Sequence, residues 1–219
     1  MNASSCWNSA IQALVAEAAE WHVIQLLFQC PSPEWRDELQ SLITEIQDAD
    51  LVEAVAIAVA AASEGAFHSI FGPGGPAPAR EASYLGTIQL GYLMSELNSY
   101  YDAFGYDPVS SPSGKEPPDH VSVEAGFISF LRLKQAYALS TECGAEAALA
   151  ADAAGSFLRE HLSNIAEPLS YALDQSGEKY LELSGKILRR RAGPAQKQIF
   201  DILDQDAAEG GCSFKCGEL

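Results

Sequence analysis

The chain has 219 residues, enough for one good hydrophobic core and too few for two ordinary domains. It is 47% hydrophobic and 20% charged, as soluble globular proteins are, and it carries a net charge of −17. This acidity argues against nucleic-acid binding, which needs clustered lysine and arginine. Residues 1–110 hold two basic and 14 acidic residues, a net charge of −12 that favours a basic partner; solubility alone is the other explanation.

The first helix is predicted around Trp21, because apolar residues follow it at helical spacing up to Phe28. Pro31-Ser32-Pro33 ends this helix, and Ser32 is expected to cap the next one, with Pro33 at its first position. That second helix is predicted to continue through Ile46. A third helix begins near Asp50 and runs through the alanine-rich stretch 54–62, which favours helix. The glycine- and proline-rich segment 72–79 then forms a loop.

A fourth helix is predicted over 81–104, followed by further helices near 118–142, 146–163 and 165–191. The last of these is expected to break at Ser176-Gly177, and Pro194 is expected to open a short final helix before a frayed tail at 207–219. Residues 105–117 are rich in proline, serine and glycine and lack hydrophobic periodicity.

These elements predict an all-α protein with one domain of about eight to ten helices. Its two halves, about 1–104 and 118–206, would be joined by a hinge at 105–117. A hinge that opens could let two chains exchange halves, so the protein is expected to be a monomer or a domain-swapped dimer.

The N-terminus lacks the basic and apolar regions of a signal peptide, and the apolar stretch 54–62 is much shorter than the roughly 20 residues that span a bilayer. We therefore expect a cytoplasmic protein with no stable membrane insertion. The five cysteines are scattered, which fits free thiols better than disulfides. Cys212 and Cys216 form a C-x-x-x-C without a convincing second ligand pair, so no zinc site is predicted there.

The most informative segment is the run from Glu116 to Phe127, in which two prolines directly precede a helical pattern. Pro117 and Pro118 stop any upstream helix and pre-set the first turn of the next one. Asp119 is expected to cap the free backbone N–H groups at that helix start, and His120 to hydrogen-bond across the hinge.

The five residues Glu116 to His120, with Glu124 and Phe127 at the expected offsets, resemble the signature of the TorD/DmsD/NarJ family of molybdoenzyme maturation chaperones. Ala125 and Ile128 replace the leucine and methionine of the family pattern. Further segments that resemble the family are Phe71-Gly72-Pro73, Glu81-Ala82-Ser83-Tyr84-Leu85, Tyr100-Tyr101-x-x-Phe104-Gly105 and Phe157-Leu158-x-x-His161-Leu162. The resemblance covers roughly residues 20–175.

The resemblance implies a non-catalytic, dedicated chaperone. It would bind an apo molybdopterin oxidoreductase, often at its twin-arginine leader, and hold it for cofactor insertion. No cofactor of its own is expected, although transient contact with the molybdopterin cofactor or a nucleotide stays open. The residues expected to bind the client or its leader are Phe71, Gly72, Pro73, Tyr84, Tyr101, Glu116, Pro117, Pro118, Asp119, His120, Glu124 and Phe127.

Two other functions remain open from the residues alone. Asp119, His120 and Glu124 could serve a helical metal- or cofactor-dependent enzyme, but no second His/Glu motif accompanies them, so no metal site is predicted. The chain could also be a general adaptor with no molybdoenzyme client. The pair Glu64 and His68, spaced i, i+4, precedes a flexible loop. The triplet 189–191 is expected to be a solvated helix end.

Overall fold

The structure is a computed structural model. It describes residues 3–85, 90–108 and 116–195, with side chains from residue 9 onward. Within these ranges the chain is helical and contains no strand, which confirms the predicted all-α single domain. The α-helices are α1 (Ala3–Leu27), α2 (Pro33–Leu42), α3 (Ala49–Ala61), α4 (Glu64–Phe71), α5 (Leu90–Phe104), α6 (Val121–Ser140), α7 (Gly144–Phe157), α8 (Ser163–Leu173) and α9 (Lys179–Ala192). The short helical turns are η1 (Ile43–Glu45), η2 (Glu81–Tyr84) and the π-helical η4 (Leu158–Leu162).

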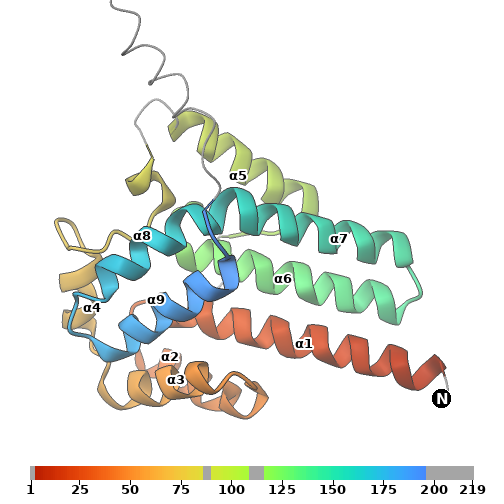
Figure 1. The fold of residues 1–219 in the computed structure, drawn as a ribbon, viewed down its shortest axis with the longest axis horizontal. Coiled ribbons are helices and arrows are strands. Elements are labelled where there is room, and N and C mark those ends of the chain that lie inside the picture. Colours follow the sequence, from red (N-terminus) through yellow and green to blue (C-terminus); the bar gives the residue numbers. More distant parts are fainter. Residues whose placement is uncertain (1–2, 86–89, 109–115, 196–219) are drawn as a thin grey trace, which may run out of the picture.

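Helices α1, α6 and α7 lie side by side and form the long axis of the molecule (Figure 1). The Ser129 hydroxyl on α6 donates to the Ala18 carbonyl on α1 at 2.8 Å, and Arg132 pairs with Glu17 at 2.9 Å. Because both contacts join residues more than 100 positions apart, the two predicted halves share one core rather than forming separate bodies.

Several helix boundaries follow from the local sequence as predicted. The Ser32 hydroxyl accepts the backbone N–H of Trp35, with Pro33 as the first residue of α2. Asp48 caps α3 in the same way through the N–H groups of Asp50 and Leu51. The break between α8 and α9 lies at Gly177, whose φ of 77° favours glycine.

Other predicted boundaries are wrong. The second helix ends at Leu42 and η1 follows, so Ile46 is extended. The fourth helix does not begin at residue 81, because residues 81–84 form only the turn η2 and α5 begins at Leu90. No helix break separates residues 163 and 165, since α7 continues through η4 into α8.

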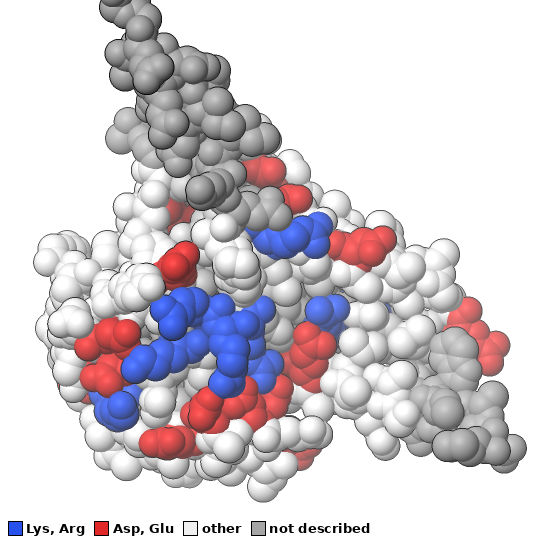
Figure 2. Space-filling view, in the orientation of Figure 1, with Lys and Arg blue, Asp and Glu red and all other residues white. Residues whose placement is uncertain are grey.

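On the face drawn in Figure 2, basic side chains gather over α9, with acidic side chains along their border. Arg191 pairs with Glu20 at 2.7 Å and with Asp48 at 2.9 Å, and Arg190 pairs with Asp48 and Asp50. Burial alone would raise the pKa of Asp48, but hydrogen bonds from the two arginines outweigh it and hold that pKa below its ordinary value.

The expectation of a solvated helix end at 189–191 is therefore wrong for Arg191, which joins α9 to α1 and to the start of α3. Parts of three predictions fall outside the described residues: the centre of the hinge, at 109–115; the final helix after Ala195; and the cysteines Cys212 and Cys216. In the described part of the chain, no single helix is long and apolar enough to span a bilayer; α3 and α4 meet that criterion only together, and they are bent by 116°.

Candidate functional site

The double-proline segment leads directly into α6, and the cap of that helix is His120, not Asp119 as predicted. The imidazole Nδ1 of His120 accepts the backbone N–H of Ser122 at 3.3 Å and lies 2.7 Å from the Ser122 hydroxyl. The cap falls on His120 because the backbone on either side of it is bonded elsewhere. The backbone N–H of Glu81 donates to the backbone carbonyl of Asp119 at 2.9 Å. The backbone N–H of Val121 donates to the backbone carbonyl of Ala79 at 2.8 Å.

The carboxylate of Asp119 turns toward this neighbouring segment rather than toward α6. The Nε of Arg80 donates to both of its oxygens, at 2.9 and 3.2 Å, and the Nη2 lies 2.8 Å from Oδ1. The backbone N–H of Ala82 donates to Oδ2 at 3.3 Å, so Asp119 also satisfies a donor in η2. Asp119 has no solvent exposure, whereas the Arg80 side chain is 46% exposed. The carboxylate of Asp119, which was predicted to bind the client, is thus already paired with an arginine of this chain.

Two more acids are buried behind Asp119. Glu81 accepts from the Asn164 side chain at 3.2 Å and lies 3.2 Å from Nδ1 of His161, with both Glu81 and His161 almost fully buried. Glu124 is completely buried, and neither of its oxygens has a hydrogen-bond partner in the described part of the chain. Burial first, and then the charges of Glu81 and Asp119, raise the pKa of Glu124 well above its ordinary value. The buried site therefore favours the protonated form of Glu124.

His120 is neutral for a related reason. Burial lowers its pKa to about 4, the positive charge of Arg80 also lowers it, and the charge of Asp119 opposes this effect. Its Nε2 lies 3.8 Å from a carboxylate oxygen of Glu116, a separation too long for a strong ion pair. A neutral His120 can therefore accept the hydrogen bond that caps α6.

Aromatic rings from α5, α6 and α7 pack behind the double proline. The ring of Phe127 lies 4.9 Å from that of Tyr101 and 4.8 Å from that of Phe157. The Tyr101 hydroxyl donates to the carbonyl of Pro118 at 2.8 Å, which fixes the position of the loop. Burial is the largest cause that raises the pKa of Tyr101 well above 10, so it stays a hydrogen-bond donor at all physiological pH values.

The loop after α4 lies at the surface. Phe71 is half-buried against Phe67 and Phe28, with ring separations of 4.8 and 6.1 Å. A Cβ on Gly72 would overlap the backbone oxygen of His68, so this position requires glycine. The Tyr84 hydroxyl donates to the Pro78 carbonyl at 2.8 Å and closes the loop, and burial raises the pKa of Tyr84 to about 12.

The structure separates the twelve predicted binding residues into two groups. The motif rim consists of the seven that reach the surface, namely Phe71, Gly72, Pro73, Tyr84, Glu116, Pro117 and Pro118. The buried layer consists of the five beneath it, namely Tyr101, Asp119, His120, Glu124 and Phe127. In this conformation the buried layer holds the rim in place and offers no surface of its own.

Sequence reasoning did not select Arg80, Glu81 or His161 for this site. The sequence did contain a reason to select Arg80. Arg80 and Arg36 are the only lysine or arginine residues among the first 110, so an ion pair with one of the many acidic residues could be expected. Glu81 and His161 lie 80 positions apart, so their pairing depends on the fold.

Two groups among the described residues bring potential metal ligands within 4.8 Å of one another: Cys30, Glu64 and His68, and Glu96, Glu160 and His161. In the second group the protein itself engages the donors, because the Tyr100 hydroxyl donates to Glu160 at 2.7 Å and His161 pairs with Glu81. Asp119, His120 and Glu124, the residues of the alternative enzyme function, belong to neither group.

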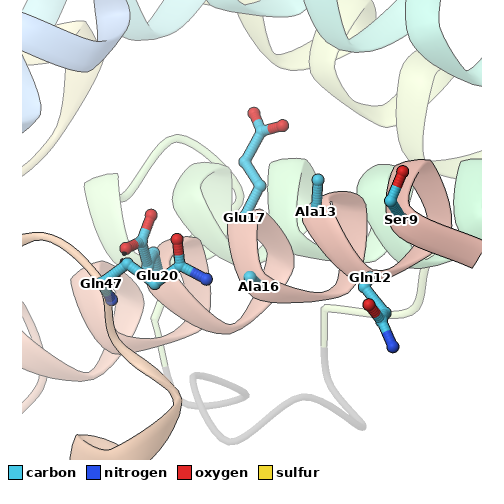
Figure 3. A pocket seen from close by; sticks show the side chains of 7 residues that line it. All are labelled: Ser9, Gln12, Ala13, Ala16, Glu17, Glu20 and Gln47. Carbon is cyan, nitrogen blue, oxygen red and sulfur yellow. Dashed lines mark hydrogen bonds between the residues drawn. The ribbon is translucent and has the colours of Figure 1, made fainter. Parts of the chain in front are cut away.

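A separate pocket of about 320 Å³ lies along α1, lined by Ser9, Gln12, Ala13, Ala16, Glu17, Glu20 and Gln47 (Figure 3). It shares no residue with the motif rim. Its two carboxylates are engaged, Glu17 by Arg132 and Glu20 by Arg191 and by the backbone N–H of Gln47. We therefore place the candidate site at the motif rim and not at this pocket.

Comparison with known families agrees with the motifs that meet at this site. The model of the nitrate reductase delta subunit family matches residues 32–169, more than half of the chain. The chain belongs to this family, whose members are maturation chaperones of molybdoenzymes rather than catalysts. The predicted membership of the TorD/DmsD/NarJ group is thereby confirmed. No curated protein and no solved structure matches the chain.

Proposed function

We propose that this protein is a cytoplasmic, non-catalytic chaperone that binds an apo molybdoenzyme catalytic subunit at the motif rim and holds it for cofactor insertion. The observation that carries the proposal is the convergence of segments far apart in sequence. Arg80 and His120 form an isolated antiparallel bridge, and Asp119 is bonded to Arg80 and Ala82. This places the loop after α4 beside the double proline.

The rim has the properties that a leader peptide requires. A twin-arginine leader has a basic segment followed by an apolar one. Phe71, Pro73 and Tyr84 offer apolar and aromatic surface, and Glu116 offers a partly exposed carboxylate. Burying two or three large apolar side chains at about 1.5–3 kcal/mol each, together with one charge pair, would supply the roughly 8 kcal/mol of micromolar binding.

The acidity of the N-terminal half supports this choice of partner. With a net charge of −12 over residues 1–110, the chain should attract a basic segment over a distance. Association rates with a leader peptide should then fall as salt rises, because added ions screen exposed charges. A rate independent of salt would leave solubility as the role of the acidity.

The test uses the full chain and the catalytic subunit encoded beside its gene. The subunit is produced without molybdopterin cofactor, once with its leader and once without it, and both forms are titrated by calorimetry. Saturable binding of the apo form, lost or weakened at least tenfold in the cofactor-loaded form, is the expected result. Equal affinity for a cofactor-free subunit of an unrelated molybdoenzyme would instead favour a general adaptor. Turnover of a small substrate by the chain alone would favour an enzyme.

The same preparation tests the oligomeric state. The contacts of α1 with α6 join the two sides of the segment 105–117, so an exchanged dimer would re-form them between chains. Cysteines introduced at Ala18 and Ser129 would then crosslink two chains in the dimer fraction. Crosslinks only within single chains, at every concentration, would show a monomer without exchange.

A further inference from the structure

Three metal-ligating side chains meet at the end of α1, outside the motif rim. Cys30 lies in the turn between α1 and α2, Glu64 is the first residue of α4, and His68 follows one helical turn later. The Cys30 Sγ lies 3.8 Å from Nε2 of His68, and a Glu64 carboxylate oxygen lies 3.6 Å from the same nitrogen. One donor atom from each residue lies within 4.8 Å of the other two.

The sulfur–nitrogen separation is that of a long hydrogen bond, and both separations are also close to those of shared metal coordination. A nitrogen–oxygen distance of 3.6 Å is beyond the usual hydrogen-bond range. Around a tetrahedral zinc with bonds of about 2.3 Å to sulfur and about 2.0–2.1 Å to nitrogen and oxygen, sulfur and nitrogen lie about 3.6 Å apart and nitrogen and oxygen about 3.4 Å apart. Small side-chain adjustments would bring the three donors to these distances.

We propose that Cys30, Glu64 and His68 form a zinc site. Thiolate, imidazole and carboxylate are the three ligand types that zinc accepts in proteins, and a thiolate disfavours magnesium and calcium. A thiolate and a carboxylate together neutralise the two positive charges of the ion. The fourth position is left to water. Zinc binding would release a proton, because the Zn–S bond forms as the S–H bond breaks and the proton passes to solvent.

The position of the site suggests what the metal would do. Glu64 and His68 belong to α4, and α4 leads directly into Phe71 and Gly72 of the motif rim. Zinc would fasten this helix to the turn after α1, 34 or more positions away in sequence, and would limit how far the rim loop moves. The site is independent of any client, so its test does not depend on the proposed function.

Cobalt(II) reports this site directly, because it takes the place of zinc and gives a near-ultraviolet thiolate charge-transfer band together with visible bands whose intensity indicates tetrahedral coordination. The reduced, chelator-treated full chain is titrated with cobalt and then with zinc. We expect one equivalent of cobalt with a thiolate band, displaced by one equivalent of zinc, and a melting temperature that rises with zinc.

The variants assign the band to its ligands. Cys30→Ser should abolish it, and Glu64→Gln and His68→Gln should each weaken binding at least tenfold while leaving the circular dichroism spectrum unchanged. Cys143→Ser, which alters an exposed thiol elsewhere, should keep the band. The double change Cys212→Ser with Cys216→Ser should also keep it. The proposal is overturned if the wild type shows no thiolate band, if Cys30→Ser retains it, or if the tail cysteines are needed for it.

Discussion

Arg80 and Asp119 are 39 positions apart, yet the guanidinium of one contacts both carboxylate oxygens of the other. The pair fastens the loop after α4 to the start of α6, so it holds the two parts of the motif rim together. Its two partners are unequally buried, since Asp119 has no exposure and the Arg80 side chain is 46% exposed. Because of this difference in burial, we expect removal of the Arg80 charge and removal of the Asp119 charge to lower the free energy of unfolding by different amounts.

Arg80→Gln should lower the free energy of unfolding by about 3 kcal/mol, because it leaves a buried carboxylate without its charge partner. Asp119→Asn should lower it by only about 1–2 kcal/mol, because the freed guanidinium can turn to solvent. Urea unfolding of both variants and of the double variant measures the coupling. Arg159→Gln, at an exposed arginine of η4, serves as the control and should change stability by less than about 0.5 kcal/mol. Equal effects of Arg80→Gln and Arg159→Gln would refute this role for the pair.

Glu124 should make the protein less stable as pH rises. Its folded-state pKa is raised, so the stability that its protonated form contributes is fully present below the ordinary value of 4.5 and is lost as pH rises toward the folded-state value. Glu124→Gln keeps the shape and removes the titration, so its stability relative to wild type should grow above pH 4.5 by up to about 1.4 kcal/mol per pH unit.

Stability curves between pH 4 and 8 measure this difference. Glu53→Gln, at an exposed position on α3, is the matched control and should run parallel to the wild type. A Glu124→Gln curve that also runs parallel to the wild type would mean that Glu124 is ionised in the folded protein.

His120 should have the opposite pH dependence. Its folded-state pKa of about 4 lies below the ordinary 6.5, so the stability that neutral His120 contributes is present above pH 6.5 and is lost as pH falls toward 4. His120→Asn retains an oxygen that can cap α6 and should flatten this loss of stability in acid. In NMR spectra the imidazole of His120 should not titrate between pH 7 and 5. Titration near pH 6.5 would contradict the burial of this side chain.

Gly72 and Gly65 should respond in opposite directions to the same change. Gly72→Ala places a Cβ against the backbone oxygen of His68 and should destabilise the protein by at least about 1–3 kcal/mol. Gly65→Ala, within α4 and with open space around it, should stabilise by about 0.5–1 kcal/mol. Melting curves compare the two. If both alanines stabilise, the turn after α4 has another conformation.

The sequence was sufficient where one local interaction decides the structure. Ser32 and Pro33 set the start of α2 because capping and proline geometry act within one turn. Gly177 marks the break before α9 because its positive φ is a local conformation that favours glycine. The start of α5 was predicted wrongly because residues 81–84, which have a helical pattern, are held by Asp119 from another part of the chain. The N–H of Glu81 donates to the backbone carbonyl of Asp119, and the N–H of Ala82 donates to its carboxylate. Such long-range pairing overrides local propensity.

The segments that form the site could be predicted from the sequence, but the contacts between their side chains could not. Asp119 follows two prolines, which is a favourable position for a cap, and only the bridge between Arg80 and His120 shows why its carboxylate turns away from α6. In the same way Glu64 and His68 are visible as an i, i+4 pair. Their meeting with Cys30 needs the fold, because Cys30 lies in the turn after α1 and the other two residues lie on α4.

The central claim, that the motif rim binds the client, is tested most directly by calorimetric titration of the apo catalytic subunit against matched variants. Glu116→Lys and Tyr84→Ala change the rim, and Glu142→Lys and Tyr137→Ala make the same changes at exposed positions at the other end of α6. We expect the rim variants to bind at least tenfold more weakly, about 1.4 kcal/mol, and the controls to bind like the wild type. Rim variants that fold and bind with the wild-type affinity would contradict the account.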